Sequence, residues 1–217
     1  MTAVPVSLDR PTAGLRIGVF GGAFDPPHKA HVALAQAAVA HLSLDTLHII
    51  PTGQAWHKTR MLSPPAHRLA RTRLAFQGLP HLLVDDCELK RAGPTVTIDT
   101  LDTLQAENPQ AQLYLVMGAD QFAAFAQWHR WEAILKLAII CIAGRAQYMS
   151  AGNQFDAYIE QKPRFSVLPL PFMAVSATQI RQLLADGDAK PPGINDLVPE
   201  PVARYIALHK LYSARVT

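Results

Sequence analysis

Short runs of consecutive apolar residues alternate along the chain with stretches in which apolar residues recur at helical spacing. The apolar runs predict strands at residues 16–20, 47–50, 82–84, 113–117, 138–143 and 165–168. The stretches between and after them predict helices at residues 29–41, 64–77 and 99–106, around Phe122, from Trp131, and at residues 177–185 and 202–208. Strands that are apolar throughout and separated by helices are typical of a parallel sheet covered on both faces. We therefore expect one doubly wound α/β domain at residues 15–217, with its ligands beyond the carboxyl ends of the strands.

The composition is that of a packed globular protein. The chain has 217 residues, of which 49% are hydrophobic and 17% charged, and this balance excludes a disordered or fibrous chain. The longest apolar run, residues 137–143, is about a third of the ~20 residues that a membrane-spanning helix needs, so we expect no membrane partner. Residues 1–14 contain charged residues and prolines without the apolar segment of a signal peptide, and we expect them to form a disordered arm.

The cysteines indicate the cellular compartment of the protein, and the net charge indicates the class of its ligands. Cys87 and Cys141 lie in or beside apolar runs, where we expect free buried thiols, and this predicts a cytoplasmic protein. The net charge of +3 fits small anionic ligands and is too low for a nucleic-acid-binding surface, so no nucleic-acid partner is expected. The oligomeric state is left open.

The stretch from Gly18 to His31 carries the strongest chemical signal. A predicted strand runs into Gly21 and Gly22, and a proline-containing loop then leads to His28 and His31 where a helix begins. Glycines let the backbone approach a phosphate closely, a helix start offers free N–H groups, and residues three apart lie on one helix face. We interpret this stretch as an anion-binding site. A tight turn alone is the plain alternative, zinc is disfavoured because no third His or Cys lies nearby, and neither common phosphate-binding fingerprint is present.

Two segments of the chain resemble the signatures of the nucleotidyltransferase superfamily. Gly21 to His31 is similar to the (H/T)-x-G-H signature, with Ala30 in place of its glycine. Ser176 to Arg181 is similar to the second signature, I-S-[ST]-T-x-I-R. The resemblance implies a Rossmann-like nucleotidyltransferase fold.

The middle of the chain resembles one branch of that superfamily, the bacterial nicotinate-nucleotide adenylyltransferases. Three blocks carry the resemblance: residues 50–58, which include His57 and Lys58, residues 88–101, and residues 118–131. The chain departs from the family at Trp56, where proline is common, and at residues 95–97, which lack the usual Ser-Tyr pair. These departures concern the edge of the nicotinate pocket.

The resemblance implies adenylyl transfer from ATP to nicotinate mononucleotide, which gives nicotinate adenine dinucleotide (deamido-NAD) and pyrophosphate in NAD biosynthesis. Two alternatives stay open: transfer to another phosphorylated acceptor such as nicotinamide mononucleotide, and a nucleic-acid-binding or regulatory module that kept the fold without turnover. The reaction needs positioning and charge stabilisation more than acid–base chemistry. Mg²⁺ is expected to arrive on the ATP phosphates without dedicated protein ligands, and Asp25 could contribute only through water.

The same resemblance assigns candidate site residues. The catalytic candidates are His28, His31, Lys58 and Arg181. The ATP-binding candidates are Gly21, Gly22, Phe24, His31, Gly118, Asp120, Ser176, Thr178 and Arg181. The candidates for binding nicotinate mononucleotide are Ala23, Phe24, His28, Thr97, Trp128 and His129, with Trp128 stacked on the pyridine ring and main-chain N–H groups near Thr97 and His129 on its carboxylate. Trp131 is assigned to packing, and Asp120 has the alternative role of a helix cap.

Overall fold

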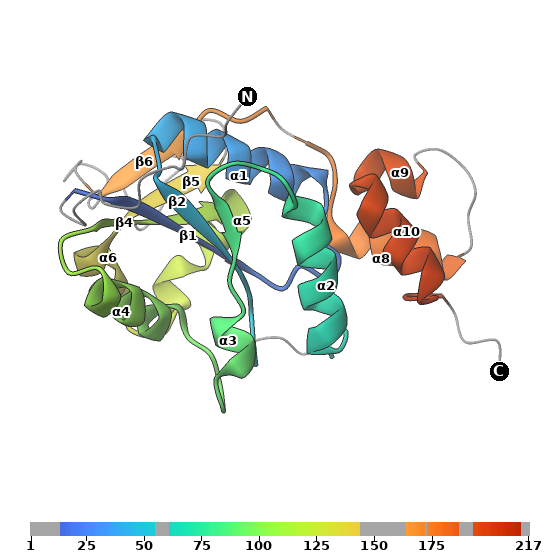
Figure 1. Cartoon of the computed structure of the whole chain (residues 1–217), viewed down its shortest axis with the longest axis horizontal. Coiled ribbons are helices and arrows are strands. Elements are labelled where there is room, and N and C mark those ends of the chain that lie inside the picture. The colour runs from blue at the N-terminus through green and yellow to red at the C-terminus, as the bar shows by residue number, and fades with distance from the viewer. Residues whose placement is uncertain (1–13, 55–60, 144–163, 172, 187–192, 214–217) are drawn as a thin grey trace, which may run out of the picture.

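A single six-stranded sheet, all of its strands parallel, organises the chain in the computed structural model (Figure 1). The structure describes residues 14–54, 61–143, 164–171, 173–186 and 193–213. The strands are β1 (Arg16–Gly22), β2 (Thr46–Pro51), β3 (Leu82–Val84), β4 (Gln112–Gly118), β5 (Ala138–Ala143) and β6 (Phe165–Leu168). Their order in the sheet is β3-β2-β1-β4-β5-β6. The predicted doubly wound α/β fold is confirmed, and the order reverses between β1 and β4, where such folds bind ligands.

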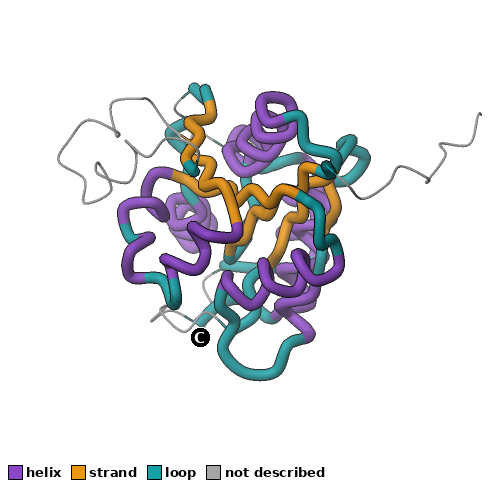
Figure 2. The backbone as a smooth tube through the Cα atoms, turned by 90° about the vertical axis from the view of Figure 1, so that its left-hand side faces the viewer, coloured by secondary structure: helices purple, strands orange, loops and turns teal. Residues whose placement is uncertain are grey.

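Helices cover both faces of this sheet (Figure 2). Their bounds are α1 (Lys29–Leu42), α2 (Pro65–Phe76), α3 (Cys87–Lys90), α4 (Thr97–Glu107), α5 (Ala119–Ala123), η1 (Phe125–Gln127), α6 (Trp131–Leu137), α8 (Ala177–Asp186), α9 (Ile194–Leu197) and α10 (Glu200–Leu208). Each predicted strand and each longer helix lies within two residues of its predicted bounds. The short elements α3, η1 and α9 were not predicted, because three or four residues are too few to show a helical period. The predicted disordered arm lies outside the described residues, apart from Gly14.

The core has two parts, one on each face of the sheet. Alternate residues of a strand point to opposite faces, so Ile17 and Val19 of β1 join one hydrophobic cluster and Phe20 joins the other. The cluster around Phe20 includes residues of α1, α2 and α10, and the other cluster includes residues of α4 and α6. Helices of the described residues therefore cover both faces of the sheet, and its strand ends are left for ligands.

The predictions about membranes and cysteines can be compared with the described residues. None of their helices combines the length and the apolar character that crossing a membrane requires. Both cysteines are free: Cys141 is buried in β5, as predicted, and Cys87 at the start of α3 is half-buried. The location in the cell stays a prediction.

Candidate active site

A cleft of about 1260 Å³ opens at the carboxyl ends of β1 and β4, where the strand order reverses. Its walls are the loop between β1 and α1, the start of α5, and the segment that leads into α8. The predicted site residues that line it are Gly21, Gly22, Ala23, Phe24, His28, His31, Gly118, Asp120, Ser176, Thr178 and Arg181. The two signatures, about 145 residues apart in the sequence, therefore face one space.

His28 and His31 form a stacked pair at the start of α1. The α1 helix begins at Lys29, so His28 takes the N-cap position with an extended backbone and His31 lies in the first turn. Their ring centroids are 3.6 Å apart and the ring planes are inclined by 26°. The ring of Phe24 meets His31 edge-on at 5.1 Å. Both imidazoles are therefore held by neighbours at the wall of the cleft.

The hydrogen bonding of His31 fixes the position of its ring proton. The main-chain N–H of His28 donates to Nδ1 of His31 at 3.1 Å. A ring nitrogen that accepts a hydrogen bond carries no proton, so the proton of the neutral ring is on Nε2. Nε2 is then a donor that an anion in the cleft could use without any change of protonation.

His28 is the more buried of the two histidines. The residue is 7% exposed. Its Nδ1 atom is buried and has no hydrogen-bond partner within the described residues. Burial lowers the pKa of His28 to about 4, so this imidazole is neutral at neutral pH. Buried polar atoms in folded proteins are nearly always hydrogen-bonded, and an exception on the wall of a cleft is typical of a ligand-binding residue.

The two glycines at the end of β1 differ in the space around them. A Cβ atom on Gly22 would lie 3.1 Å from the ring of Phe24, which itself has a φ of 45° and is 1% exposed. A Cβ atom on Gly21 would meet nothing within 4 Å. A side chain at position 22 would thus press closely on the buried ring of Phe24, whereas Gly21, which lines the cleft, leaves open space.

Gly118 and Asp120 meet across the end of β4. A Cβ atom on Gly118 would lie 2.7 Å from Oδ1 of Asp120, so the glycine gives this carboxylate room to fold back over the strand end. Asp120 is exposed and lines the cleft. It lies in the first turn of α5, where a negative charge is also favoured by the helix dipole. The N-cap position of α5 belongs to Gly118, so Asp120 does not take the alternative role of a helix cap, and its place in the cleft is compatible with the predicted ATP-binding role.

The second signature forms the opposite wall. Oγ of Ser176 accepts a hydrogen bond from the main-chain N–H of Gln179 at 3.2 Å and so caps α8, whose first residues face the cleft. Arg181 donates from Nη2 to Oγ1 of Thr178 at 3.0 Å and from Nη1 to the main-chain carbonyl of Asp25 at 2.8 Å. This last bond joins the two signatures directly and fixes the guanidinium group beside the cleft.

Asp25 is placed differently from the role considered for it. Its side chain is 1% exposed and accepts hydrogen bonds from Ser63, Arg71 and Tyr212, so its carboxylate is committed to a buried network. A water-mediated contact with Mg²⁺ does not fit this burial. The described residues contain no cluster of three or more His, Cys, Asp or Glu side chains that could hold a metal ion.

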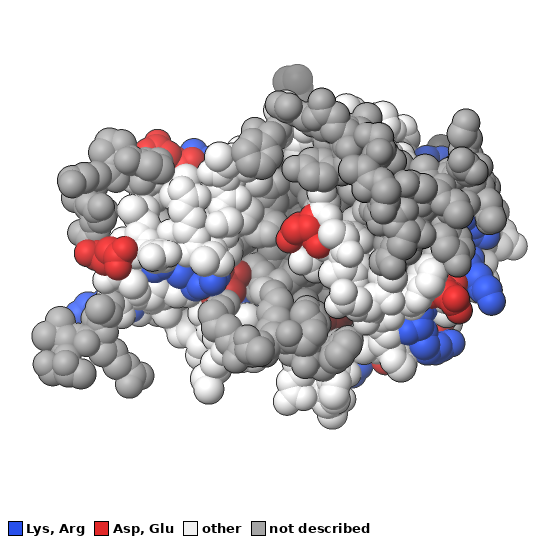
Figure 3. Space-filling model, turned by 180° about the vertical axis from the view of Figure 1, so that it is seen from behind, with Lys and Arg blue, Asp and Glu red and all other residues white. Residues whose placement is uncertain are grey.

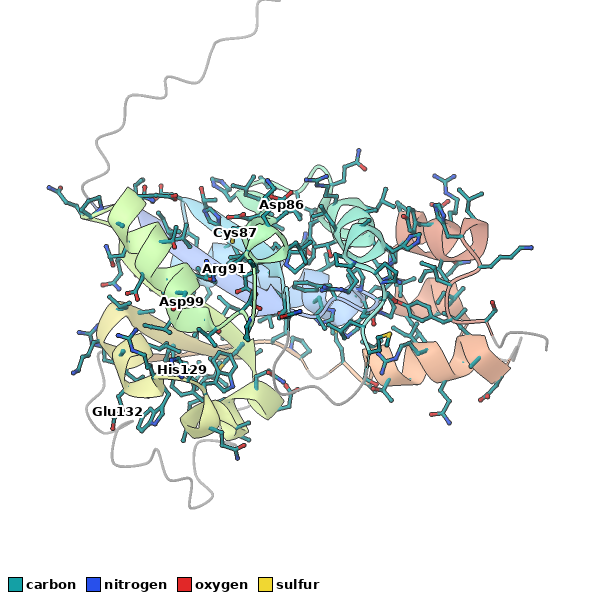
Figure 4. All side chains as sticks on the ribbon, turned by 90° about the horizontal axis from the view of Figure 1, so that it is seen from below. Asp86, Cys87, Arg91, Asp99, His129 and Glu132 are labelled. Carbon is teal, nitrogen blue, oxygen red and sulfur yellow. The ribbon has the colours of Figure 1, made fainter. Side chains whose placement is uncertain are left out.

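Three of the predicted nicotinate-nucleotide contacts are not among the residues that line the cleft. Thr97 begins α4, and Trp128 and His129 lie between η1 and α6. The helices α4 and α6 pack together, and Figure 4 shows Asp99 of α4 and His129 on the same side of the molecule. Trp128 is half-buried and meets the ring of Phe125 edge-on at 5.5 Å. Trp131 packs on the same ring at 6.1 Å, as expected of a packing residue.

Two of the blocks that carry the family resemblance contact each other: the described part of residues 50–58 lies against residues 88–101. The loop after β2 pairs with the loop before α4, because the main-chain N–H of Thr95 donates to the carbonyl of Gln54 at 3.1 Å. A Cβ atom on Gly53 would lie 2.2 Å from the carbonyl oxygen of Glu88. The Glu88 carboxyl accepts a hydrogen bond from Thr100 of α4 at 3.0 Å, and burial raises its pKa. Trp56, His57 and the predicted catalytic residue Lys58, from the same block, lie outside the described residues.

The cleft also contains residues that sequence reasoning missed. Apolar side chains from the segment before α8 line it, and Gln121 of α5 lies beside them. The apolar members are Leu170, Met173 and Val175. These three residues could have been found from the sequence, because their apolar segment lies directly before the second signature. The partners of Asp25 could not be predicted in this way. They lie 38, 46 and 187 residues from it in the sequence, at Ser63, Arg71 and Tyr212, too far apart to form a recognisable motif.

Comparisons with known proteins agree with the resemblance. A family model described as cytidylyltransferase-like matches residues 19–183. A relative from Albidiferax ferrireducens named "Probable nicotinate-nucleotide adenylyltransferase" is 54% identical over 197 residues, which is 91% of this chain and 98% of the relative. A relative of the same name from Methylibium petroleiphilum is 40% identical over 199 residues, 91% of this chain and 92% of its own.

The fold has solved counterparts. The nicotinic acid mononucleotide adenylyltransferase of Plasmodium falciparum complexed with NaAD superimposes with a TM-score of 0.76 at 18% identity, covering 91% of this chain and 97% of its own. The same enzyme complexed with APC gives a TM-score of 0.73. With its family match over most of the length and its relatives at 40% and 54% identity, this chain belongs to the cytidylyltransferase-like family and, within it, to the nicotinate-nucleotide adenylyltransferases.

Proposed function

We propose that this chain transfers the adenylyl group of ATP to nicotinate mononucleotide and so contributes to NAD biosynthesis. Membership of the family supports the reaction. The observation in the structure that carries the proposal is the hydrogen bond of 2.8 Å from Arg181 to the carbonyl of Asp25. It brings the second signature against the loop of the first, beside the stacked pair of His28 and His31, in a cleft large enough for nucleotides.

The chemical step is a displacement at the α-phosphorus of ATP. A phosphate oxygen of nicotinate mononucleotide forms the new P–O bond, and the bond from the α-phosphorus to the oxygen bridging to the β-phosphate breaks, with its electron pair leaving on pyrophosphate. The attacking phosphate has a second pKa of about 6 and is already mostly dianionic at pH 7, so no general base is needed. The protein contributes alignment and stabilisation of charge.

The histidine pair and α8 supply the charge-stabilising groups in this proposal. Nε2 of His31 donates to a phosphate oxygen in the neutral state of the ring, as its tautomer allows. His28, also neutral, hydrogen-bonds the phosphate of the attacking nucleotide. The first N–H groups of α8, with Ser176 and Thr178, hold the β- and γ-phosphates, and Arg181 balances charge on the leaving pyrophosphate. Lys58 shares this last role.

Magnesium enters with the substrate in this account. Mg²⁺ prefers substrate phosphates and water to an all-protein cage, and the described residues offer no cluster of metal ligands. The ion supplies charge neutralisation on the triphosphate when bound. The contribution of the chain is to bind the phosphates that carry it, through α8 and Arg181.

The acceptor is selected at the α4 side of the molecule. The first main-chain N–H groups of α4, from Thr97, and that of His129 bind the nicotinate carboxylate, while Trp128 stacks on the pyridine ring. Fixed donors accept a carboxylate but oppose the N–H₂ group of an amide. We therefore propose that nicotinate mononucleotide is preferred over nicotinamide mononucleotide.

The distribution of surface charge bears on whether nucleic acid is a partner of the protein. Figure 3 shows the described Lys and Arg side chains on one face in small groups beside Asp and Glu side chains. Nucleic-acid binding needs a basic stripe or patch, and the described side chains in view form mixed groups instead. We propose a cytoplasmic enzyme whose partners are ATP and nicotinate mononucleotide.

Product identification tests the reaction. The purified chain is incubated with ATP, Mg²⁺ and one of several phosphorylated acceptors, and the products are identified by mass while pyrophosphate is quantified. The proposal predicts one pyrophosphate per nicotinate adenine dinucleotide formed. Turnover restricted to an acceptor without a pyridine ring would favour the alternative within the superfamily, and no turnover with any acceptor would favour a module without catalysis.

A further inference from the structure

A buried polar cluster lies behind the loop of the first signature. It consists of Asp25, Ser63, Arg71 and Tyr212. The Asp25 carboxylate accepts hydrogen bonds from Oγ and the main-chain N–H of Ser63 at 2.6 and 3.1 Å, from Nη2 of Arg71 at 3.1 Å and from the Tyr212 hydroxyl at 2.5 Å. The Asp25 and Arg71 side chains are 1% and 0% exposed. The cluster therefore holds the loop through a fully desolvated ion pair.

Tyr212 brings the C-terminal segment into this cluster. It lies just after α10, and its ring lies 5.0 Å from the Arg71 guanidinium, whose Nη1 also donates to the Tyr212 hydroxyl. Burial raises the pKa of Tyr212, so the hydroxyl stays protonated and can donate to Asp25. A hydroxyl that accepts from a guanidinium and donates to a carboxylate is a strong link, because both bonds involve charged partners.

Asp25 connects the cluster to the cleft. Its carboxylate is fixed behind the loop, while its main-chain carbonyl accepts the hydrogen bond from Nη1 of Arg181 at 2.8 Å. Asp25 also precedes His28 by three residues. Asp25 therefore links the buried cluster, through its carboxylate, to Arg181, through its main-chain carbonyl.

We infer that Tyr212 is a positioning residue that acts through Asp25 to hold Arg181 in its orientation for adenylyl transfer. The inference rests on the proposed function and adds a residue that lies in none of the sequence motifs. Arg71 and Ser63 support the same carboxylate. Removing the hydroxyl of Tyr212 or that of Ser63 leaves the buried ion pair of Asp25 and Arg71 in place.

Tyr212→Phe in the full chain is the direct test. The variant keeps the ring on Arg71 and removes only the hydroxyl. We expect kcat to fall roughly tenfold with the KM for ATP within about twofold of the wild type, since a misplaced group that acts in the transition state lowers kcat and kcat/KM together. The matched control is Tyr205→Phe, which removes a hydroxyl from α10 that hydrogen-bonds Nδ1 of His67 at 2.9 Å. It should keep kcat within about twofold.

A double-mutant cycle separates positioning from general stability. Turnover is followed with radiolabelled ATP so that slow variants are measurable. In an Arg181→Gln background, we expect Tyr212→Phe to lower kcat by less than about twofold, because the group that it positions is gone. An effect of equal size in both backgrounds, or a Tyr212→Phe variant with wild-type kcat, overturns the inference.

Two further measurements keep the result interpretable. If Tyr212→Phe does not fold, as judged by circular dichroism, Ser63→Ala takes its place in the same cycle and is expected to show the same coupling to Arg181. The wild-type chain is assayed first: absence of turnover with nicotinate mononucleotide and ATP contradicts the proposed function itself. Turnover in the wild type together with no coupling contradicts only the role of Tyr212.

Discussion

At the scale of single residues, His31 uses its two ring nitrogens for different purposes. Nδ1 accepts the main-chain N–H of His28 at the start of α1, while Nε2 carries the proton of the neutral ring in a residue that lines the cleft. A substitution can therefore remove one function and keep the other. The oxygen of asparagine can replace Nδ1 as an acceptor, and the amide nitrogen of glutamine reaches the position of Nε2.

We predict that His31→Asn lowers kcat/KM at least about tenfold, because a charge-assisted hydrogen bond contributes ~1.5–3 kcal/mol and each ~1.4 kcal/mol is tenfold in rate. His31→Gln should retain more activity than His31→Asn. Thermal unfolding should rank the two variants in the opposite order, since asparagine keeps the bond to the His28 N–H. Equal kinetics for wild type and His31→Asn would contradict the role of Nε2.

Gly21 allows a second separation of binding from stability. A Cβ atom there meets nothing within 4 Å of the protein, so Gly21→Ala should change the free energy of unfolding by less than about 0.5 kcal/mol. If a phosphate approaches this backbone closely, the same methyl group obstructs it, and kcat/KM should fall by about tenfold or more. Denaturant unfolding and steady-state kinetics check the two halves of this prediction. Unchanged kinetics in a stable variant would show that no ligand comes close to Gly21.

Burial of His28 makes a prediction about pH and stability. The native pKa is about 4 against 6.5 for the unfolded chain, so between these values the unfolded state binds a proton that the native state does not. The free energy of unfolding therefore falls as pH is lowered through this range, by up to about 1.4 kcal/mol per pH unit from this group. His28→Asn, which keeps a good N-cap residue, should show a shallower fall. Parallel stability curves for the two proteins between pH 4 and 6.5 would contradict the burial of a neutral imidazole.

At the scale of elements, the strands and longer helices could be predicted because their apolar runs are bounded by strong signals. Gly78, with a φ of 74°, follows the end of α2, and Pro65 begins the helix, one residue after the predicted start. The contact between the middle blocks could not be predicted. It depends on the carbonyl of Glu88 lying where a side chain on Gly53 would be, and neither residue type reveals this proximity.

That contact predicts the effect of Gly53→Ala. A methyl group 2.2 Å from a main-chain oxygen forces the loop after β2 away from α3, and overpacking of this kind costs about 1–3 kcal/mol. We also expect a higher KM for nicotinate mononucleotide, because the loop before α4 hydrogen-bonds the displaced segment. Gln54→Ala is the control, since Gln54 contributes its main-chain carbonyl and its side chain is exposed. Equal free energies of unfolding for the two variants would show that a side chain at position 53 does not collide with the carbonyl of Glu88.

At the scale of the whole molecule, the parallel sheet determines where the chemistry is possible. Helices cover both faces, and the reversal of strand order between β1 and β4 opens the edge that both signatures share. Sequence motifs identified the residues at this edge because the chemistry restricts their types. The buried network of Asp25, Arg71 and Tyr212 joins three distant parts of the chain. It could not be predicted from the sequence, because no local pattern relates these three residues.

The central claim is that the cleft joins ATP to a pyridine nucleotide that carries a carboxylate. It is tested most directly by measuring kcat/KM for nicotinate mononucleotide and for nicotinamide mononucleotide, each with ATP and Mg²⁺. We predict formation of deamido-NAD with a preference for the carboxylate substrate of at least about tenfold, the size of a lost charge-assisted hydrogen bond. Equal or greater kcat/KM for the amide would contradict the account.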